Sequence, residues 1–352
     1  MPEMQQFLKK IISTSGLSGH EEPVRRIIEE AWRPLVDEIH VSRVGSLHAL
    51  RRGIGDAPRS SLLLAAHMDA IGLMVSGINS EFLRITEIGG IDQRVLPGQI
   101  VTVHGREDLP GLVVQPPSHL LPPDNRNGSV KIQNLLVDTG LHAEELRRLV
   151  RPGDLVSFAQ PPFDLSNEVL VGHSLDNRAS IACVTQCLLE LVGRPLCWDL
   201  WAVATTQEEE TFAGAYTSAF ELRPTLAVAI DVTFASSPGS PSHKTFPMGK
   251  GITLCWGPNI HPGVFEAFKN LATRLEIPYS VEVTPRHSGT DAYGLQVAAE
   301  GIPTMVVSIP LRYMHTPVEM ISMKDVMRLG RLLAEFAACL DEDFMSGLVW
   351  DK

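Results

Sequence analysis

Metal-capable side chains follow four strongly apolar stretches, each about as long as a β-strand. SLLLAA runs into His67, WAVATT leads to Glu208 and Glu209, LAVAI ends at Asp231, and TMVVSIP precedes His315. Open α/β sheets build their sites where strands end at the carboxyl edge, so these side chains are expected to meet there. Imidazole nitrogens beside carboxylate oxygens suit zinc, cobalt or manganese. The pattern therefore predicts a divalent-metal centre.

Each predicted ligand also has a simpler structural alternative when it is considered alone. Polar groups at the ends of buried strands are costly unless they are paired or coordinated, and this favours metal binding for the set as a whole. The set contains no cysteine, which argues against a purely structural zinc site. The predicted metal ligands are His67, Asp176, Glu209, Asp231 and His315.

Two aspartates have roles that depend on their neighbours. Asp176 lies in GHSLDNR, directly before a predicted helix, where an N-cap is the structural alternative. A site with two ions about 3.5–4 Å apart needs a bridging carboxylate, and Asp176 is the best-placed candidate. Asp69 follows His67 by two residues, where its carboxylate can accept the other imidazole N–H and fix the tautomer. The alternative for Asp69 is an ordinary turn residue.

The acidic run QEEE predicts a division of labour between two neighbouring glutamates. Such runs are usually solvated faces, but the strand before this one is apolar and the following TFAGAY is not charged. We assign Glu209 as a ligand and Glu208 as the general base. Two divalent ions would lower the pKa of a water, and Glu208 would take its proton and pass it to the leaving amine. These roles predict amide hydrolysis.

Composition restricts the partners and the compartment of the chain. Its net charge of −11, without any run of Lys and Arg, argues against nucleic acid as a partner. Five cysteines without a CxxC pair favour reduced thiols. No apolar run approaches ~18 residues, and the first residues lack a signal-peptide pattern. We expect no membrane partner and a cytoplasmic location.

The chain has 352 residues, more than one hydrophobic core normally accommodates, so two domains are expected. The secondary-structure patterns that must position the site are accordingly of two kinds. Alternating strand and helix patterns predict an α/β domain with a mostly parallel sheet sandwiched by helices. Short β-like runs between residues 69 and 165 predict an inserted small β domain. Residues 1–68 and 166–352 then form a discontinuous catalytic domain. Strand patterns cover 61–66, 198–205, 226–230 and 304–309, and helix patterns cover 3–12, 21–35, 177–192, 262–275 and 323–340.

Six motifs follow one another along the chain: AHMDAIGLMV, SLDNRAS, TTQEEE, AIDVT, SGTDAYG and RYMHTPVE. In this order and spacing they resemble those of the tetrahedral aminopeptidases, a family of dinuclear metallopeptidases that includes glutamyl, leucyl and lysyl aminopeptidases. The resemblance covers essentially the whole chain. It implies a zinc-peptidase-like fold and an aminopeptidase that acts on peptides with two divalent ions per subunit.

The resemblance also implies how the ligands are shared and how subunits assemble. His67 and Asp231 would hold one ion, Glu209 and His315 the other, and Asp176 would bridge them. The inserted domain would be PDZ-like or a β-barrel and would form dimers that assemble further into twelve-subunit shells. Homo-oligomers from dimer to dodecamer are therefore expected.

Several positions depart from the family pattern. The family usually has Glu at Ala70, Asp at Asn177, and Val-Gly in place of Glu210 and Thr211. None of these changes removes a predicted ligand. The loss of two carboxylates near the ions alters the local field, so metal preference, pH optimum and substrate choice stay open.

Two further residues are candidates for supporting roles near the site. Arg178 could pair with ligand carboxylates, and Asp291 could contact substrate or order its loop, with structural roles equally open for both.

Two other functions are compatible with these residues. The same metals could hydrolyse other amides, such as N-acyl amino acids, and a non-catalytic assembly protein could retain the fold. Glycoside hydrolysis, a label given to some family members, fits less well because it normally relies on two metal-free carboxyl groups.

Overall fold

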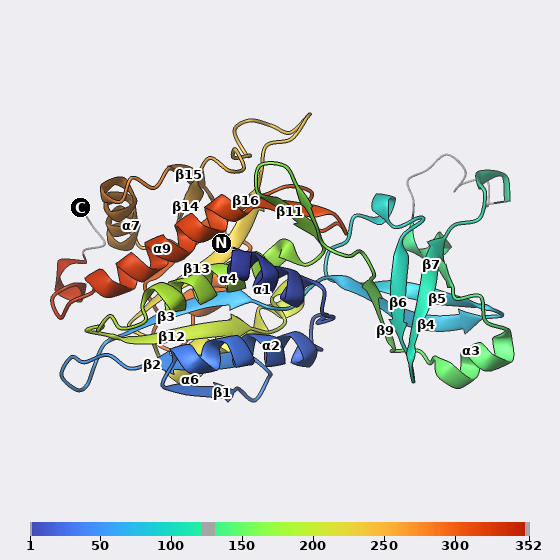
Figure 1. Ribbon diagram of the computed structural model, residues 1–352, viewed down its shortest axis with the longest axis horizontal. Coiled ribbons are helices and arrows are strands. Elements are labelled where there is room, and N and C mark those ends of the chain that lie inside the picture. The colour runs from blue at the N-terminus through green and yellow to red at the C-terminus, as the bar shows by residue number, and fades with distance from the viewer. Residues whose placement is uncertain (1, 121–130, 349–352) are drawn as a thin grey trace.

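The apolar runs that precede the predicted ligands form adjacent strands at the centre of an eight-stranded sheet (Figure 1). The computed structural model describes residues 2–120 and 131–348. The sheet order is β1-β2-β12-β3-β13-β16-β14-β15, with β12, β3, β13 and β16 mutually parallel. Strands covered on both faces are apolar throughout rather than alternating, which explains these runs. The bounds are β1 Glu38–Val41, β2 Leu47–Arg51, β3 Ser61–His67, β12 Asp199–Thr205, β13 Leu226–Phe234, β14 Ile252–Trp256, β15 Tyr279–Val283 and β16 Thr304–Leu311.

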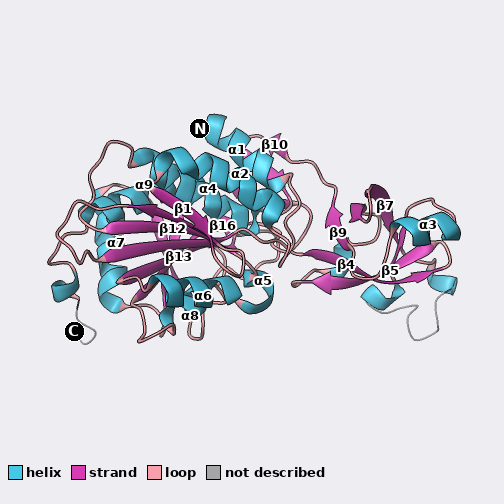
Figure 2. Ribbon diagram, turned by 90° about the horizontal axis from the view of Figure 1, so that it is seen from below, coloured by secondary structure: helices cyan, strands magenta, loops and turns pink. Residues whose placement is uncertain are grey.

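Helices cover both faces of this sheet (Figure 2). On one face α4 packs against α1 and α9, and on the other α6 packs against α8. The predicted sheet sandwiched by helices is confirmed. None of the described helices is both long enough and apolar enough to cross a bilayer. The bounds of these helices are α1 Pro2–Ile12, α2 Glu22–Trp32, α4 Leu175–Glu190, α5 Glu208–Thr211, α6 Ala213–Leu222, α7 Pro262–Arg274, α8 Ala292–Gln296 and α9 Met323–Cys339, while α3 Ala143–Leu149 lies with the barrel (Figure 2).

A closed six-stranded barrel is inserted in the sequence between β3 and β12 of the large sheet. It extends from one end of the α/β part (Figure 1). It has a hydrophobic core of its own, to which Val101, Val113 and Val137 belong. Closure pairs every strand on both sides and so leaves no exposed sheet edge. The predicted small β domain with barrel character is thus observed. Its strands are β4 Gly72–Asn79, β5 Phe82–Ile88, β6 Ile100–His104, β7 Asp108–Val114, β8 Leu136–Asp138 and β9 Leu155–Phe158.

The chain returns from the barrel through a small antiparallel sheet that the sequence patterns do not predict. Its order is β10-β11-β17, with bounds Phe163–Leu165, Val169–Gly172 and Glu319–Ser322. Gly172 pairs with Glu319 at one end of this sheet. The small sheet therefore places the segment before α4 beside the segment after β16.

Candidate metal centre

The carboxyl ends of the parallel strands bring the predicted ligands to one edge of the large sheet. His67 is the last residue of β3 and lies opposite Thr205, the last residue of β12. Glu208 opens α5 three residues later. Asp231 lies inside β13, three residues before its end, and His315 follows the end of β16 by four residues. Segments far apart in the sequence thus meet at one place.

Asp176 lies between the two predicted histidine ligands. Its Oδ1 is 3.2 Å from His67 Nε2, and its Oδ2 is 3.4 Å from His315 Nε2. His315 Nε2 is also 3.5 Å from Glu209 Oε2. The two oxygens of one carboxylate therefore face two different imidazoles, which is the arrangement that a bridging ligand requires.

Two further acids lie near the same nitrogen of His67. His67 Nε2 lies 3.7 Å from Glu208 Oε2 and 4.0 Å from Asp231 Oδ1. Donor atoms of His67, Asp176 and Glu209 lie within 4.8 Å of one another, and so do those of His67, Glu208 and Asp231. The structure thus gathers all five predicted ligands and the predicted base in one cluster.

Burial of several acids together strongly affects their protonation. Burial raises the pKa of Glu209 to about 8, and the negative charge of Asp176 adds to this. Burial also raises the pKa of Glu208 and of Asp231 well above their usual range. For Asp176 burial acts in the same direction, but hydrogen bonds from His315 and His67 outweigh it and lower the pKa. Such a cluster holds protons that a divalent cation can replace.

Several buried polar atoms at the centre have no hydrogen-bond partner among the described residues. A buried polar atom without a partner costs roughly 1–3 kcal/mol, so a cluster of them needs an explanation. Coordination of cations would satisfy the glutamate oxygens, and the donor set therefore fits divalent metal. The atoms are His67 Nδ1, Asn177 Oδ1, Glu208 Oε1, Glu209 Oε1 and Asp291 Oδ1.

Asp69 supports the helix that carries the two glutamates. Its Oδ1 accepts the backbone N–H of Glu208 at 3.1 Å, and its Oδ2 accepts that of Glu209 at 3.2 Å. The same Oδ1 lies 3.3 Å from His67 Nδ1, on the side of the ring away from Asp176. One fully buried carboxylate therefore holds the backbone of both glutamates and lies beside the ring of His67.

Glu319 is a site residue for which sequence reasoning assigned no role. Its Oε2 accepts the backbone N–H of Asp176 at 3.1 Å, and its Oε1 accepts that of His315 at 3.0 Å. The side chain is buried at the start of β17. The only sequence signal is its place in RYMHTPVE, four residues after His315 and next to an apolar run. Glu319 fixes the separation of two predicted ligands.

Comparison with known proteins agrees with this geometry. The sequence profile of the M42 glutamyl aminopeptidase family matches residues 45–332. The chain belongs to this family. It is 32% identical over 339 residues to the lysyl aminopeptidase of Pyrococcus furiosus, which covers 94% of this chain and 96% of that protein. The predicted family and enzyme class are therefore confirmed. The M42 peptidases are metallopeptidases, and the described residues contain candidate metal-binding groups.

Solved structures show the same fold. The TET aminopeptidase of a marine sediment archaeon of the Thaumarchaeota superposes with a TM-score of 0.93 at 29% identity, covering 99% of each chain. The TET1 peptidase of Pyrococcus horikoshii, described as assembling into a tetrahedron or a large octahedral shell, has a TM-score of 0.84 at 29% identity. That match covers 96% of this chain and 100% of the Pyrococcus horikoshii chain.

Replacing Glu319 of this M42 peptidase with glutamine is expected to weaken metal binding by roughly 10–100-fold, the usual effect of losing a residue that orients ligands. Glutamine has one acceptor oxygen where the carboxylate supplies two, so one of the two backbone N–H groups loses its partner. Chelator competition measures the affinity. Glu282→Gln is a matched control, because Glu282 accepts hydroxyls of Thr233 and Thr253. Equal affinities in Glu319→Gln and the parent would contradict this role.

Arg178 has a different role from the predicted pairing with ligand carboxylates. Its guanidinium is completely buried and donates to the backbone carbonyls of Ile11, Thr14, Gly16 and Met68. A planar group with five N–H donors suits several converging carbonyls. In this M42 peptidase Arg178 ties the N-terminal segment to the turn after His67.

Asp291 orders its loop, one of the two roles considered for it. Its Oδ2 accepts the hydroxyl of Thr205, the residue opposite His67 at the end of β12. Burial raises the pKa of Asp291 to about 6. The carboxylate thereby joins the loop before α8 to the strand ends that carry the site.

Glu210, one of the residues that depart from the family pattern, links the barrel to the site. Glu210 Oε1 accepts the backbone N–H of Gly89 at 2.6 Å, just after β5. The next residue, Gly90, lies so close to the site that an added Cβ would stand 3.2 Å from His315 Nδ1. The barrel of this M42 peptidase therefore supplies part of the wall of the metal centre.

Metal removal is expected to destabilise this peptidase more as the pH rises from about 5 to 9. Burial raises the pKa of Glu209 from 4.5 to about 8. Burial opposes a rise for His315, yet hydrogen bonding to Asp176 and the charge of Glu209 raise its pKa from 6.5 to about 9. A group whose pKa is higher in the folded protein than in the unfolded chain stabilises the fold fully at a pH below its pKa in the unfolded chain. This stabilisation is lost as the pH rises through its pKa in the folded protein.

A bound cation takes the place of these protons and removes the dependence. The melting temperatures of chelator-treated and metal-loaded protein should therefore diverge with increasing pH. Parallel profiles over this range would contradict the assignment of Glu209 and His315 to the metal centre.

Proposed function

We propose that this chain is a dinuclear, metal-dependent aminopeptidase that removes N-terminal residues from peptides. The observation that carries the proposal is the position of Asp176, whose two oxygens lie close to two different histidines, Oδ1 to His67 and Oδ2 to His315. A single ion would not need a carboxylate shared in this way. Family membership supports the aminopeptidase activity, and the curated relative from Pyrococcus furiosus is named for lysyl substrates.

The proposed ligands divide between two ions. His67 and Asp231 would hold one, Glu209 and His315 would hold the other, and Asp176 would be shared between them. When bound, two divalent ions supply an acidified water and a polarised substrate carbonyl. Zinc and cobalt fit these nitrogen and oxygen donors best, and manganese is compatible with them.

Glu208 acts as the proton carrier of the reaction. Its Oε2 lies on the ligand cluster, 3.7 Å from His67 Nε2, while its buried Oε1 has no partner among the described residues. Burial raises its pKa, so the carboxylate holds a proton well once it has taken one from water. The Glu208 carboxyl group then delivers that proton to the leaving amine. Asp69 positions Glu208 through its backbone N–H and orients His67.

A substrate panel tests this function against the hydrolysis of other amides and against a non-catalytic assembly role. Apo-protein is reconstituted separately with zinc, cobalt and manganese and given aminoacyl-p-nitroanilides and their N-acylated counterparts. Turnover of the free-amine substrates alone, in the metal-loaded protein alone, is the expected result. Preference for the acylated set would show an amide hydrolase of another kind. Lack of turnover on both sets, with ions bound, would support the non-catalytic alternative.

We propose that residues 69–165 form an inserted dimerisation domain and that residues 1–68 and 166–352 form the catalytic domain. The two separate hydrophobic cores support this division. We further propose that the chain forms homo-oligomers from dimer to dodecamer; the tetrahedron and large octahedral shell described for the TET1 peptidase of Pyrococcus horikoshii support assembly into large homo-oligomers. The five unpaired cysteines are in keeping with a cytoplasmic location. Light scattering on the full chain measures the assembly state.

A further inference from the structure

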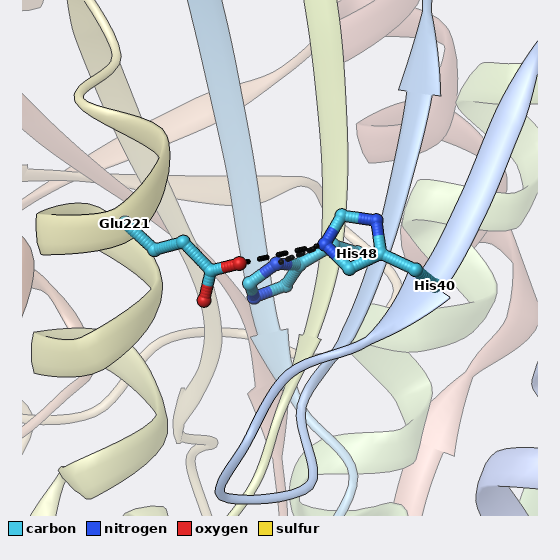
Figure 3. A group of neighbouring side chains, drawn as sticks. All are labelled: His40, His48 and Glu221. Atoms are coloured by element: carbon cyan, nitrogen blue, oxygen red, sulfur yellow. Dashed lines mark hydrogen bonds and ion pairs between the residues drawn. The ribbon is translucent and has the colours of Figure 1, made fainter.

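A second group of metal-capable side chains lies at the far edge of the large sheet, where Figure 3 shows them pointing toward one another. His40 comes from β1, His48 from β2 and Glu221 from α6. His40 and His48 face each other because they are paired directly across the β1–β2 hairpin. None of the three belongs to the metal centre described above.

The distances within this group match the spacing of ligands around one ion. His40 Nε2 lies 3.3 Å from His48 Nδ1 and 3.6 Å from Glu221 Oε1. Two ligand atoms about 2.0–2.1 Å from a tetrahedral zinc ion stand roughly 3.3–3.4 Å apart. The same 3.3 Å also allows a hydrogen bond between the two rings, so this distance alone does not select between a bond and an ion. All three donor atoms lie within 4.8 Å of one another.

His48 is held so that one ring nitrogen faces this point. Its side chain is completely buried, and its Nε2 lies 2.8 Å from the hydroxyl oxygen of Ser218 on α6. When Nε2–H donates to Ser218, Nδ1 keeps its lone pair and directs it at His40. A hydrogen bond from the second nitrogen is the usual way in which proteins orient a ligating histidine.

The position is open to solvent on one side. The side chains of His40 and Glu221 are 45% and 47% exposed. Glu221 also lines a surface cavity of about 790 Å³ together with Ser42, Thr217 and Phe220. An ion can therefore enter from solvent, and water can complete its coordination.

We propose that His40, His48 and Glu221 form a mononuclear divalent-cation site, separate from the catalytic centre and selective for zinc-like ions. Two imidazoles and one carboxylate suit zinc better than magnesium or calcium, which prefer all-oxygen ligands. The ion would join the β1–β2 hairpin at the sheet edge to α6. The role of the ion would be structural, because it would fix the position of α6, which directly follows the short helix that carries Glu208.

The competing explanation is a hydrogen-bonded chain without an ion. In that case a His40 N–H donates to His48 Nδ1, and the same ring lies beside Glu221. The two explanations differ in stoichiometry, because only the first predicts an additional bound ion.

Zinc stoichiometry tests the proposal on the full chain. Metal-free protein is incubated with excess zinc, desalted and measured by elemental analysis, for the parent and the variants His40→Ala and Glu221→Gln. The matched control is His142→Ala, which removes a histidine 3.0 Å from Glu81 where no third donor completes a group among the described residues. The readout is the difference between proteins, so it does not depend on how many ions the catalytic centre holds.

His40→Ala is expected to bind one zinc fewer per chain than the parent and His142→Ala. Glu221→Gln should release that zinc at a chelator concentration at least about tenfold lower. The zinc-dependent rise in melting temperature should also be smaller in His40→Ala than in the parent. Equal zinc content in the parent and in folded His40→Ala would overturn the proposal. If His40→Ala does not fold, unchanged zinc release by Glu221→Gln overturns it instead.

Discussion

Glu208→Gln is expected to lower the turnover of a peptide substrate by about 10²–10⁴-fold, the range typical of losing a general base. Glutamine keeps the size of the side chain but cannot hold the proton that passes from water to the leaving amine. Glu208 already lies against His67, and burial favours its protonated form. Steady-state kinetics with a reactive aminoacyl-anilide measures the loss as kcat.

The neighbouring Glu210 provides the matched control for this change. Glu210→Gln removes a charge from the same acidic run, yet a glutamine oxygen can still accept the N–H of Gly89. Turnover close to that of the parent is therefore expected. A comparable loss in both variants would show that the negative charge of the segment, and not a proton carrier at position 208, sustains the reaction.

Metal content decides between two roles for Glu208. Its donor atom lies in one group with those of His67 and Asp231, so a ligand role is geometrically open. The base assignment predicts that Glu208→Gln keeps the metal content of the parent while it loses turnover. Loss of an ion would make Glu208 a ligand, and parent-level turnover would remove the mechanism.

The convergence of the ligands was predictable because it follows from sheet geometry. Runs such as SLLLAA and LAVAI are too apolar for any place but the centre of a covered sheet, and parallel strands end at one edge. His67 and Asp231 could therefore be placed together without knowing any contact. Asp176 is not on a strand, and its bridging role depended on the need for one more carboxylate.

The supporting residues could not be predicted, because their partners are backbone groups. Glu319 accepts a backbone N–H from a residue 143 positions away, and Arg178 donates to carbonyls up to 167 positions away. Every residue has such groups, so the sequence carries no pattern that selects among them. The β10-β11-β17 sheet, which brings Glu319 to the site, was missed for the same reason.

Short elements at the site were also missed, and the cause lies in the periodicity of the sequence. The segment from Glu208 to Leu222 forms two helices joined at Phe212, whose positive φ of 54° breaks the repeat. Neither helix shows a sustained apolar stripe, so no helical pattern is visible before the contacts are known. His40 and His48 lie directly opposite each other only through the pairing of β1 with β2, which the strand patterns did not predict.

Asp176→Ala and His315→Ala are expected to differ in the number of ions they lose, and this difference tests the bridging role. Removing Asp176 takes one ligand from each ion, whereas removing His315 takes a ligand from one ion only. Elemental analysis after desalting should therefore find two fewer catalytic ions in Asp176→Ala and one fewer in His315→Ala. Turnover should be abolished in both, because the reaction needs both ions.

Both variants are expected to stay folded, since each removes charge from a cluster whose core contacts lie elsewhere. Asp176→Ala also retains the backbone N–H that Glu319 accepts, so the start of α4 keeps its anchor. Circular dichroism checks the fold independently of activity. A single lost ion in Asp176→Ala would show that this carboxylate binds on one side only. The division of ligands between the ions would then have to be reassigned, because nothing else in the cluster presents two oxygens to two imidazoles.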